Sequence, residues 1–166
     1  MKIEHLEERI NEYKTSIQTV IEKRILWDTK IKTQIFQTLK KVENTYLVGW
    51  KVQELKWIHT NEAININFDS FPPELMEMAN GIPSFQFLQG GSLVFSQLHN
   101  GDINVFVLFP IVENTVPLEN EIEDLGIFTP KEITEKLIVE KVDEFLKQMI
   151  QWEVPLAKSK VGFKNQ

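Results

Sequence analysis

Apolar side chains in the first 44 residues return at every third or fourth position, which is the spacing of one face of an α-helix. Lysine and glutamate occupy most of the positions between them. Asn44 is a suitable end for such a helix, because asparagine tolerates the left-handed conformation that ends many helices. The apolar positions are Ile3, Leu6, Ile10, Tyr13, Ile17, Val20, Ile21, Ile31, Ile35, Leu39 and Val42. This pattern predicts a long N-terminal helix.

The length of this helix raises a second expectation. Unbroken, it would span about 60 Å at the rise of an α-helix, whereas a compact domain of this chain length is about 40 Å across. Arg24 and Asp28 interrupt the apolar face one turn apart, and Asp28 or Thr29 could cap a second helix. We therefore expect the helix to overhang the body, to bend, or to break near residues 24–29.

The first part of the helix has a tighter repeat. Ile3, Ile10 and Ile17 lie seven residues apart, and Leu6, Tyr13 and Val20 occupy the complementary position between them. Isoleucine at one seam position with leucine or valine at the other is typical of a short coiled coil. One interpretation is that residues 1–27 project as a coiled-coil helix, with these six residues as a dimer or partner interface. The other is an amphipathic helix that lies on its own sheet.

Residues 45–109 change to the two-residue alternation of β-strands. The segment 62–70 alternates most clearly, with Ile64, Ile66 and Phe68 on one side and asparagine or aspartate on the other. Pro72-Pro73 then opens a short helical insertion, and a further strand is expected to begin at Phe85. The alternation predicts an antiparallel or mixed sheet of about five strands.

The segment 91–109 is predicted to be the central hairpin of this sheet. Asn100-Gly101 is a favoured two-residue turn, which would set Leu98 or His99 against Asp102 or Ile103. Both alternating sets of side chains in its strands are largely apolar, so both faces of the hairpin require a cover. That cover could be the chain's own helix, a second copy of the chain, or a ligand.

The C-terminal part combines an acidic connection with a well-specified helix. Residues 111–128 contain five acidic residues and no basic one, and we expect a connection without regular structure. Thr129, Pro130 and Glu132 have the spacing of a capped helix start, and an apolar face follows as far as Pro155. The chain is therefore expected to fold as one α+β domain, residues 1–154, with the C-terminal amphipathic helix packed on the sheet and a loose basic tail at 155–166.

Composition limits the kind of protein this can be. The 166-residue chain has a formal charge of −6 and no cysteine, which excludes disulfides and thiolate chemistry and suits a reducing compartment. The acidic balance opposes nucleic-acid binding and favours a protein partner with a basic surface. We find no signal peptide or apolar run of membrane-spanning length in the sequence, and expect a cytoplasmic protein with no membrane association.

Catalytic and metal-binding motifs are not apparent. His5, His59 and His99 fall on different predicted elements without the spacing of metal ligands. No nucleophile elbow or phosphate-binding loop occurs in the sequence. We therefore predict no metal, cofactor or catalytic residues, although an enzymatic activity stays open.

The aromatic and methionine residues support one further reading. A curved sheet with a flexible cover could enclose a small apolar ligand. The candidate pocket residues are Trp50, Trp57, Met76, Met78, Phe95 and Phe106. The alternative is that they fill the core beneath the helices.

Two functional hypotheses follow. The first is a non-catalytic protein-binding protein, chaperone- or adaptor-like, that acts as a homodimer through its N-terminal helix or the second face of its sheet. The second is a monomeric protein with a pocket for a small apolar ligand. The order of elements loosely resembles that of small acidic chaperones of bacterial secretion systems, but no residue motif accompanies this resemblance, and it transfers no sites.

Overall fold

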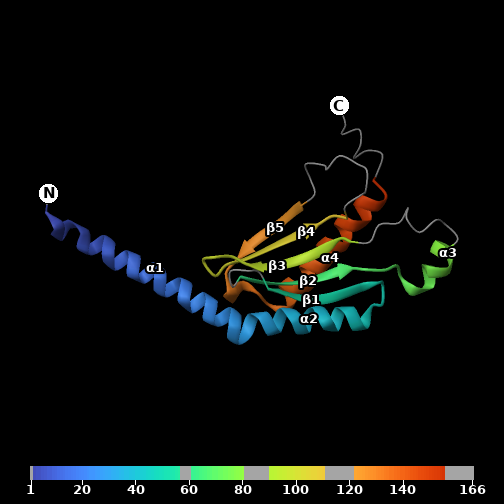
Figure 1. Cartoon of the computed structure of the whole chain (residues 1–166), viewed down its shortest axis with the longest axis horizontal. Coiled ribbons are helices and arrows are strands. Elements are labelled where there is room, and N and C mark those ends of the chain that lie inside the picture. Colours follow the sequence, from blue (N-terminus) through green and yellow to red (C-terminus); the bar gives the residue numbers. More distant parts are fainter. Residues whose placement is uncertain (1, 57–60, 81–89, 111–121, 156–166) are drawn as a thin grey trace, which may run out of the picture.

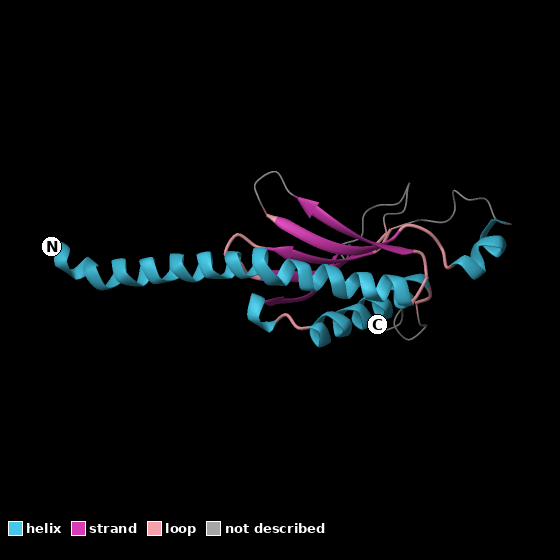
Figure 2. Ribbon diagram, turned by 90° about the horizontal axis from the view of Figure 1, so that it is seen from below, coloured by secondary structure: helices cyan, strands magenta, loops and turns pink. Residues whose placement is uncertain are grey.

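The computed structural model describes residues 2–56, 61–80, 90–110 and 122–155. They form an α+β fold with one antiparallel sheet, helices on one face of that sheet, and a long helix that extends beyond the body (Figures 1 and 2). The predicted fold class is confirmed. The strand expected to begin at Phe85, residues 57–60 and most of the tail at 155–166 lie outside the described residues.

The N-terminal helix is continuous from Ile3 to Thr45. A short 3-10 turn leads into α1 (Glu7–Leu26), and α2 (Lys32–Thr45) ends one residue after Asn44. Between them the chain forms a π-helical turn, Trp27–Ile31, in the region where a bend or break was one of the expectations. A π-helical turn keeps the backbone hydrogen-bonded, so the helix stays continuous. It is longer than the sheet, and α1 overhangs it (Figure 1).

The sheet has five antiparallel strands in the order β1-β2-β3-β4-β5. Their bounds are β1 Trp50–Lys56, β2 Glu62–Phe68, β3 Ser92–Gln97, β4 Ile103–Leu108 and β5 Ile122–Phe128. Consecutive strands are neighbours throughout. The helical insertion between β2 and β3 is a 3-10 turn, Pro73–Leu75, followed by α3 (Met76–Asn80), which lies away from the sheet (Figure 1).

The core lies between one face of the sheet and two helices. α2 and α4 (Glu135–Glu153) contact each other and cover the same face (Figure 2). The fully buried side chains of this core include Trp27, Ile35, Leu39, Ile64, Ile66, Leu93, Phe95, Val105, Ile138 and Phe145. The apolar side chains that alternate along the strands and those on the apolar faces of α2 and α4 therefore form one core.

The β3–β4 hairpin has a longer turn than the sequence suggested. Leu98 and Asp102 pair as one of the expected alternatives, with the Leu98 amide donating to the Asp102 carbonyl at 2.8 Å. Three residues rather than two separate them. Gly101, at φ +89°, supplies a left-handed position, and the Asp102 amide donates to the Asn100 side chain at 3.0 Å. Three-residue hairpin loops usually end with a residue in the left-handed conformation, which glycine adopts readily.

The expectation that residues 111–128 lack regular structure was wrong for Ile122–Phe128, which form β5. This strand pairs with β4 along one side only, and a register shift lies opposite Asn104 and Phe106. Most of its side chains are exposed, because it is an edge strand. An exposed edge strand carries little apolar alternation, so its sequence looks like a solvated acidic loop.

The predicted start of the C-terminal helix was five residues too early. Thr129 and Glu132 do form a capping box, but on the separate 3-10 turn Pro130–Glu132. Ile133 then adopts an extended conformation and is buried. The α4 helix begins after Thr134, whose hydroxyl accepts the Leu137 amide at 3.1 Å.

Candidate functional site

The projecting helix α1 is anchored at its C-terminal end by the tip of the β3–β4 hairpin. The Lys23 ammonium lies 2.8 Å from the Asp102 carboxylate, and both groups are partly buried. The Arg24 guanidinium donates to the His99 carbonyl and to the Asn61 side chain, each at 3.4 Å. The backbone of Gly101 approaches the helix so closely that a Cβ there would lie 2.5 Å from Lys23 Cβ. The body therefore begins to cover α1 in its last two turns.

The π-helical turn forms the second half of this anchor. Trp27 is buried in the core, and its indole N–H donates to Glu62 at 3.0 Å. The Lys32 ammonium lies 3.2 Å from the same carboxylate and 3.5 Å from Asp28. Burial opposes ionisation of Glu62, but the hydrogen bonds from Trp27 and Lys32 outweigh it and hold the Glu62 pKa below its ordinary value. These contacts fix where α1 leaves the body.

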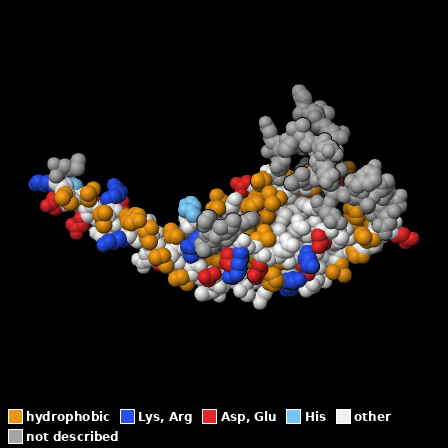
Figure 3. All heavy atoms as spheres, in the orientation of Figure 1, with side chains coloured by type: hydrophobic (Ala, Val, Ile, Leu, Met, Phe, Trp, Pro, Cys, Tyr) orange, Lys and Arg blue, Asp and Glu red, His pale blue; other side chains and the backbone are white. Residues whose placement is uncertain are grey.

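Beyond the anchor, α1 exposes an apolar stripe. The exposed members are Ile3, Leu6, Ile10, Tyr13, Ile17, Ile21 and Ile25. Their exposed fractions range from 41% at Ile17 to 80% at Ile3, and no residue of α1 is buried. Val20, whose carbonyl lies near the hairpin tip, is partly covered. Figure 3 shows apolar side chains along the length of this helix. The structure thus brings the six predicted interface residues together on one projecting helix and not on the sheet.

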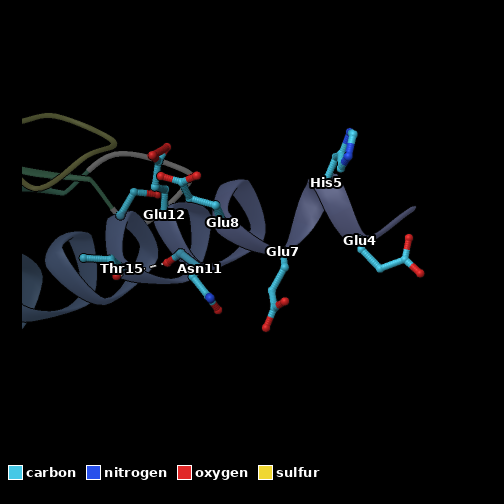
Figure 4. Close-up of a pocket in the computed structure, with 8 residues that line it drawn as sticks. Glu4, His5, Glu7, Glu8, Asn11, Glu12 and Thr15 are labelled. Carbon is cyan, nitrogen blue, oxygen red and sulfur yellow. Dashed lines mark hydrogen bonds between the residues drawn. The ribbon is translucent and has the colours of Figure 1, made fainter. Parts of the chain in front are cut away.

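The opposite face of α1 is polar and acidic. Glu4, Glu8 and Glu12 lie on this side with Asn11 and Thr15, and the shallow hollow among them is open to solvent (Figure 4). The Thr15 hydroxyl donates to the Asn11 carbonyl at 3.0 Å, within the helix itself. Across the described residues no group of histidine, aspartate and glutamate is placed to hold a metal ion. The helix is therefore amphipathic, and its polar face is open to solvent.

The candidate pocket residues lie in separate environments. Trp50 and Phe95 are buried in the core beneath the helices, and Trp50 donates its indole N–H to the Tyr46 carbonyl at 2.7 Å. Phe106 lies on the other face of the sheet, because it alternates with the core residues of β4. Met76 and Met78 are exposed on α3. Trp57 lies outside the described residues. The five described residues therefore do not line a common cavity.

The second face of the sheet, which was expected to be covered, is less apolar than the first. Its central positions include Asn65, Ser92, Val94 and Ser96, and the Asn65 amide donates to the Ser92 hydroxyl at 2.8 Å. Figure 3 shows this face, with a white area of backbone and uncharged polar side chains at its centre. No described helix packs on it (Figure 2), but Asn65, Ser92 and Val94 are buried there, as the expected cover requires. In this respect the sheet differs from the projecting helix, which presents a continuous apolar surface.

Two features of the site were missed from the sequence. Ile21 was assigned only to the apolar face and Ile25 to no group, yet both extend the exposed stripe. The anchor formed by Trp27 and Glu62 joins residues 35 positions apart. The seven-residue repeat that runs through Val20 continues to Trp27. This continuation indicated in the sequence that the seam leads from the free helix into the core.

Comparison with known proteins identified no matching family model, no curated protein and no solved structure. None of the helices within the described residues combines the length and the apolar character needed to cross a membrane. The geometry of α1 is therefore the basis on which a function can be proposed.

Proposed function

We propose that this protein acts by binding protein, as a homodimer in which α1 of one copy packs along α1 of a second copy. In this view it is a non-catalytic, cytoplasmic protein with a chaperone- or adaptor-like role. The observation that carries the proposal is the exposed apolar stripe of the projecting helix. Large contiguous apolar surfaces are uncommon on monomers and mark interaction sites.

The stripe has the form of a coiled-coil seam. Ile3, Ile10 and Ile17 occupy one seam position, and Leu6, Tyr13 and Val20 occupy the other. Side chains at these two positions insert between those of a facing helix, which removes their apolar surface from water. A seam of this kind is self-complementary, so a second copy of α1 is its simplest partner.

The body of the protein leaves this surface free. Its own core lies beneath α2 and α4, and in the described part of the chain α1 is exposed over residues 7–19 and first becomes partly covered at Val20. The seam spans about three heptads, so we expect a dimer whose population depends on protein concentration. Oligomer formation would then cover the apolar residues that the fold itself leaves exposed.

The test is the mass in solution, measured by light scattering on a sizing column at several protein concentrations. We expect a dimer for the wild-type protein and a folded monomer for the double variant Ile10→Glu/Ile17→Glu. Both isoleucines are exposed in the single chain, so the substitutions leave the core intact.

The matched control is Asn11→Glu/Gln18→Glu, which adds the same charges with the same spacing one residue further along the helix. Both control positions are exposed and lie outside the stripe, so the control should dimerise like the wild type. A wild-type protein that stays monomeric at every concentration would contradict the proposal and would favour the monomeric apolar-ligand protein. A dimer that survives Ile10→Glu/Ile17→Glu would place the contact elsewhere.

A further inference from the structure

We infer that the two α1 helices pair in antiparallel orientation, about a two-fold axis between Ile10 and Tyr13, with each Glu7 facing Lys14 of the partner subunit. This inference rests on the proposed function, since it specifies how the second copy is bound. Three independent features of α1 support it: the fit of the seam, the position of the charges, and the point at which the body begins.

The seam fits an antiparallel partner over its whole free length. In an antiparallel pair, the residues at one seam position face those at the other. Ile3 then lies against the partner's Val20, Leu6 against the partner's Ile17, and Ile10 against the partner's Tyr13. By the two-fold symmetry each pair occurs twice, so each of the six seam residues faces one seam residue of the other helix.

The body of the protein limits the length of α1 that is free to pair, and this length agrees with the antiparallel seam. The hairpin tip first approaches α1 at the Val20 carbonyl, which lies 3.4 Å from a Cβ built on Gly101. In the antiparallel pair the partner's helix ends at Ile3 opposite Val20, next to the point where the hairpin begins. The pairing therefore ends where the body begins to cover the helix, although Ile21 and Ile25 are exposed as well.

The flanking charges distinguish the two orientations. Glu7 and Lys14 occupy the position that follows the Leu6 and Tyr13 seam site, and antiparallel pairing brings these flanking positions together. Two symmetric attractive pairs result, Glu7 with the partner's Lys14 and the reverse. Parallel pairing would instead place Arg9 against the partner's Lys14, which is repulsive, and would give Glu7 only Lys2, which precedes the helix, as an opposite charge. Within the described residues neither Glu7 nor Lys14 forms an ion pair in its own chain, whereas Arg9 pairs with Glu12.

Antiparallel pairing has a consequence for the whole assembly. The two bodies lie at opposite ends of the helix pair, with the two Trp27 residues separated by about 45 Å along the axis, from the rise of an α-helix. Each body then presents its sheet and its α3 independently. Such a dimer is a spacer with two equivalent ends.

The charge test uses Lys14→Glu. In the antiparallel dimer this change converts two attractive pairs into Glu–Glu contacts, and we expect the dissociation constant to rise about fivefold to tenfold. The double variant Glu7→Lys/Lys14→Glu restores opposite charges and should return the affinity to near the wild-type value. In a parallel dimer Lys14→Glu would remove the repulsion with Arg9 and tighten the dimer, which would overturn the inference. Lys30→Glu, an exposed site on the body, controls for net charge.

A distance measurement gives a second, charge-independent test. The chain has no cysteine, so Glu4→Cys, Asn11→Cys and Gln18→Cys each introduce one labelling site, and the three sites share one position of the seven-residue repeat. For spin labels in the antiparallel dimer, the Asn11 site should give a short distance, and the Glu4 and Gln18 sites should each carry about 20 Å of additional axial offset. Three equal distances would show a parallel dimer and overturn the inference while the proposed function stands. A wild-type protein that remains monomeric would instead overturn the proposed function.

Discussion

At the scale of single residues, Glu62 connects the projecting helix to the sheet. Its carboxylate accepts the Trp27 indole N–H at 3.0 Å and lies 3.2 Å from the Lys32 ammonium. Burial of Lys32 disfavours its charge, but the partnership with Glu62 outweighs this and raises the Lys32 pKa above its ordinary value. Lys32 therefore stays protonated at every pH at which Glu62 titrates, and the pair depends on the state of Glu62 alone.

We expect Glu62→Gln to lower the free energy of unfolding by about 1–2 kcal/mol at neutral pH, because the amide keeps one acceptor but loses the charge that Lys32 requires. The Glu62 pKa is lowered in the folded state. Its contribution is therefore present above the pKa of the unfolded chain and is lost as the pH falls through the folded-state pKa. Urea unfolding of both proteins across the acidic range measures this difference.

The matched control for this experiment is Glu54→Gln, an exposed carboxylate on β1. It should leave the free energy of unfolding nearly unchanged at neutral pH. If the gap between wild type and Glu62→Gln persisted undiminished at acidic pH, the ionised Glu62 carboxylate would not be what stabilises the anchor.

At the scale of secondary-structure elements, the start of α4 rests on Thr134. Its hydroxyl accepts the Leu137 amide, and α4 carries Ile138, Val142, Phe145 and Met149 into the core. We expect Thr134→Ala to lower the free energy of unfolding by about 1 kcal/mol, the usual cost of losing an N-cap. Thr33→Ala, the same change at an exposed position within α2, should be neutral or slightly stabilising, because alanine has the higher helix propensity. An equal loss in the two variants, measured by urea unfolding, would show that the Thr134 cap contributes nothing specific.

The elements that could be predicted from the sequence are those whose burial is periodic. The helical spacing of α2 and α4 and the alternation of β2 and the central hairpin each reflect one face turned to the core. β5 was not predicted, because its side chains are mostly exposed and its place in the sheet depends on backbone pairing with β4. The start of α4 was misplaced, because a capping box also fits the short turn that precedes it.

The candidate site, like the fold, was predicted only in part. The seven-residue repeat of α1 indicated the seam, because spacing within one helix is fixed by local geometry. The attachment of that helix was not predictable, because Lys23 with Asp102 and Trp27 with Glu62 join residues far apart in the chain. The pocket hypothesis also depended on tertiary placement. Phe95 and Phe106, on neighbouring strands, lie on opposite faces of the sheet.

At the scale of the whole molecule, α1 has little to hold it helical in a single copy. An isolated helix of this length is marginally stable in water, since most helical stability in proteins comes from packing of an apolar face. The apolar face of α1 is exposed from Ile3 to Ile17, and its contacts with the body begin only near Val20. A second copy would supply the missing packing, so dimerisation and helical order in α1 should be coupled.

Hydrogen exchange of the backbone amides tests this coupling. In the dimeric wild-type protein we expect the amides of residues 7–20 to be protected, and in Ile10→Glu/Ile17→Glu to exchange rapidly, because unpaired helices open readily. The amides of α2 near Ile35 and Leu39, which are fully buried, should be protected equally in both proteins. The control Asn11→Glu/Gln18→Glu should match the wild type throughout. Rapid exchange across residues 7–20 in a protein that light scattering shows to be a dimer would mean that α1 is not the contact, and that the two copies meet through the body.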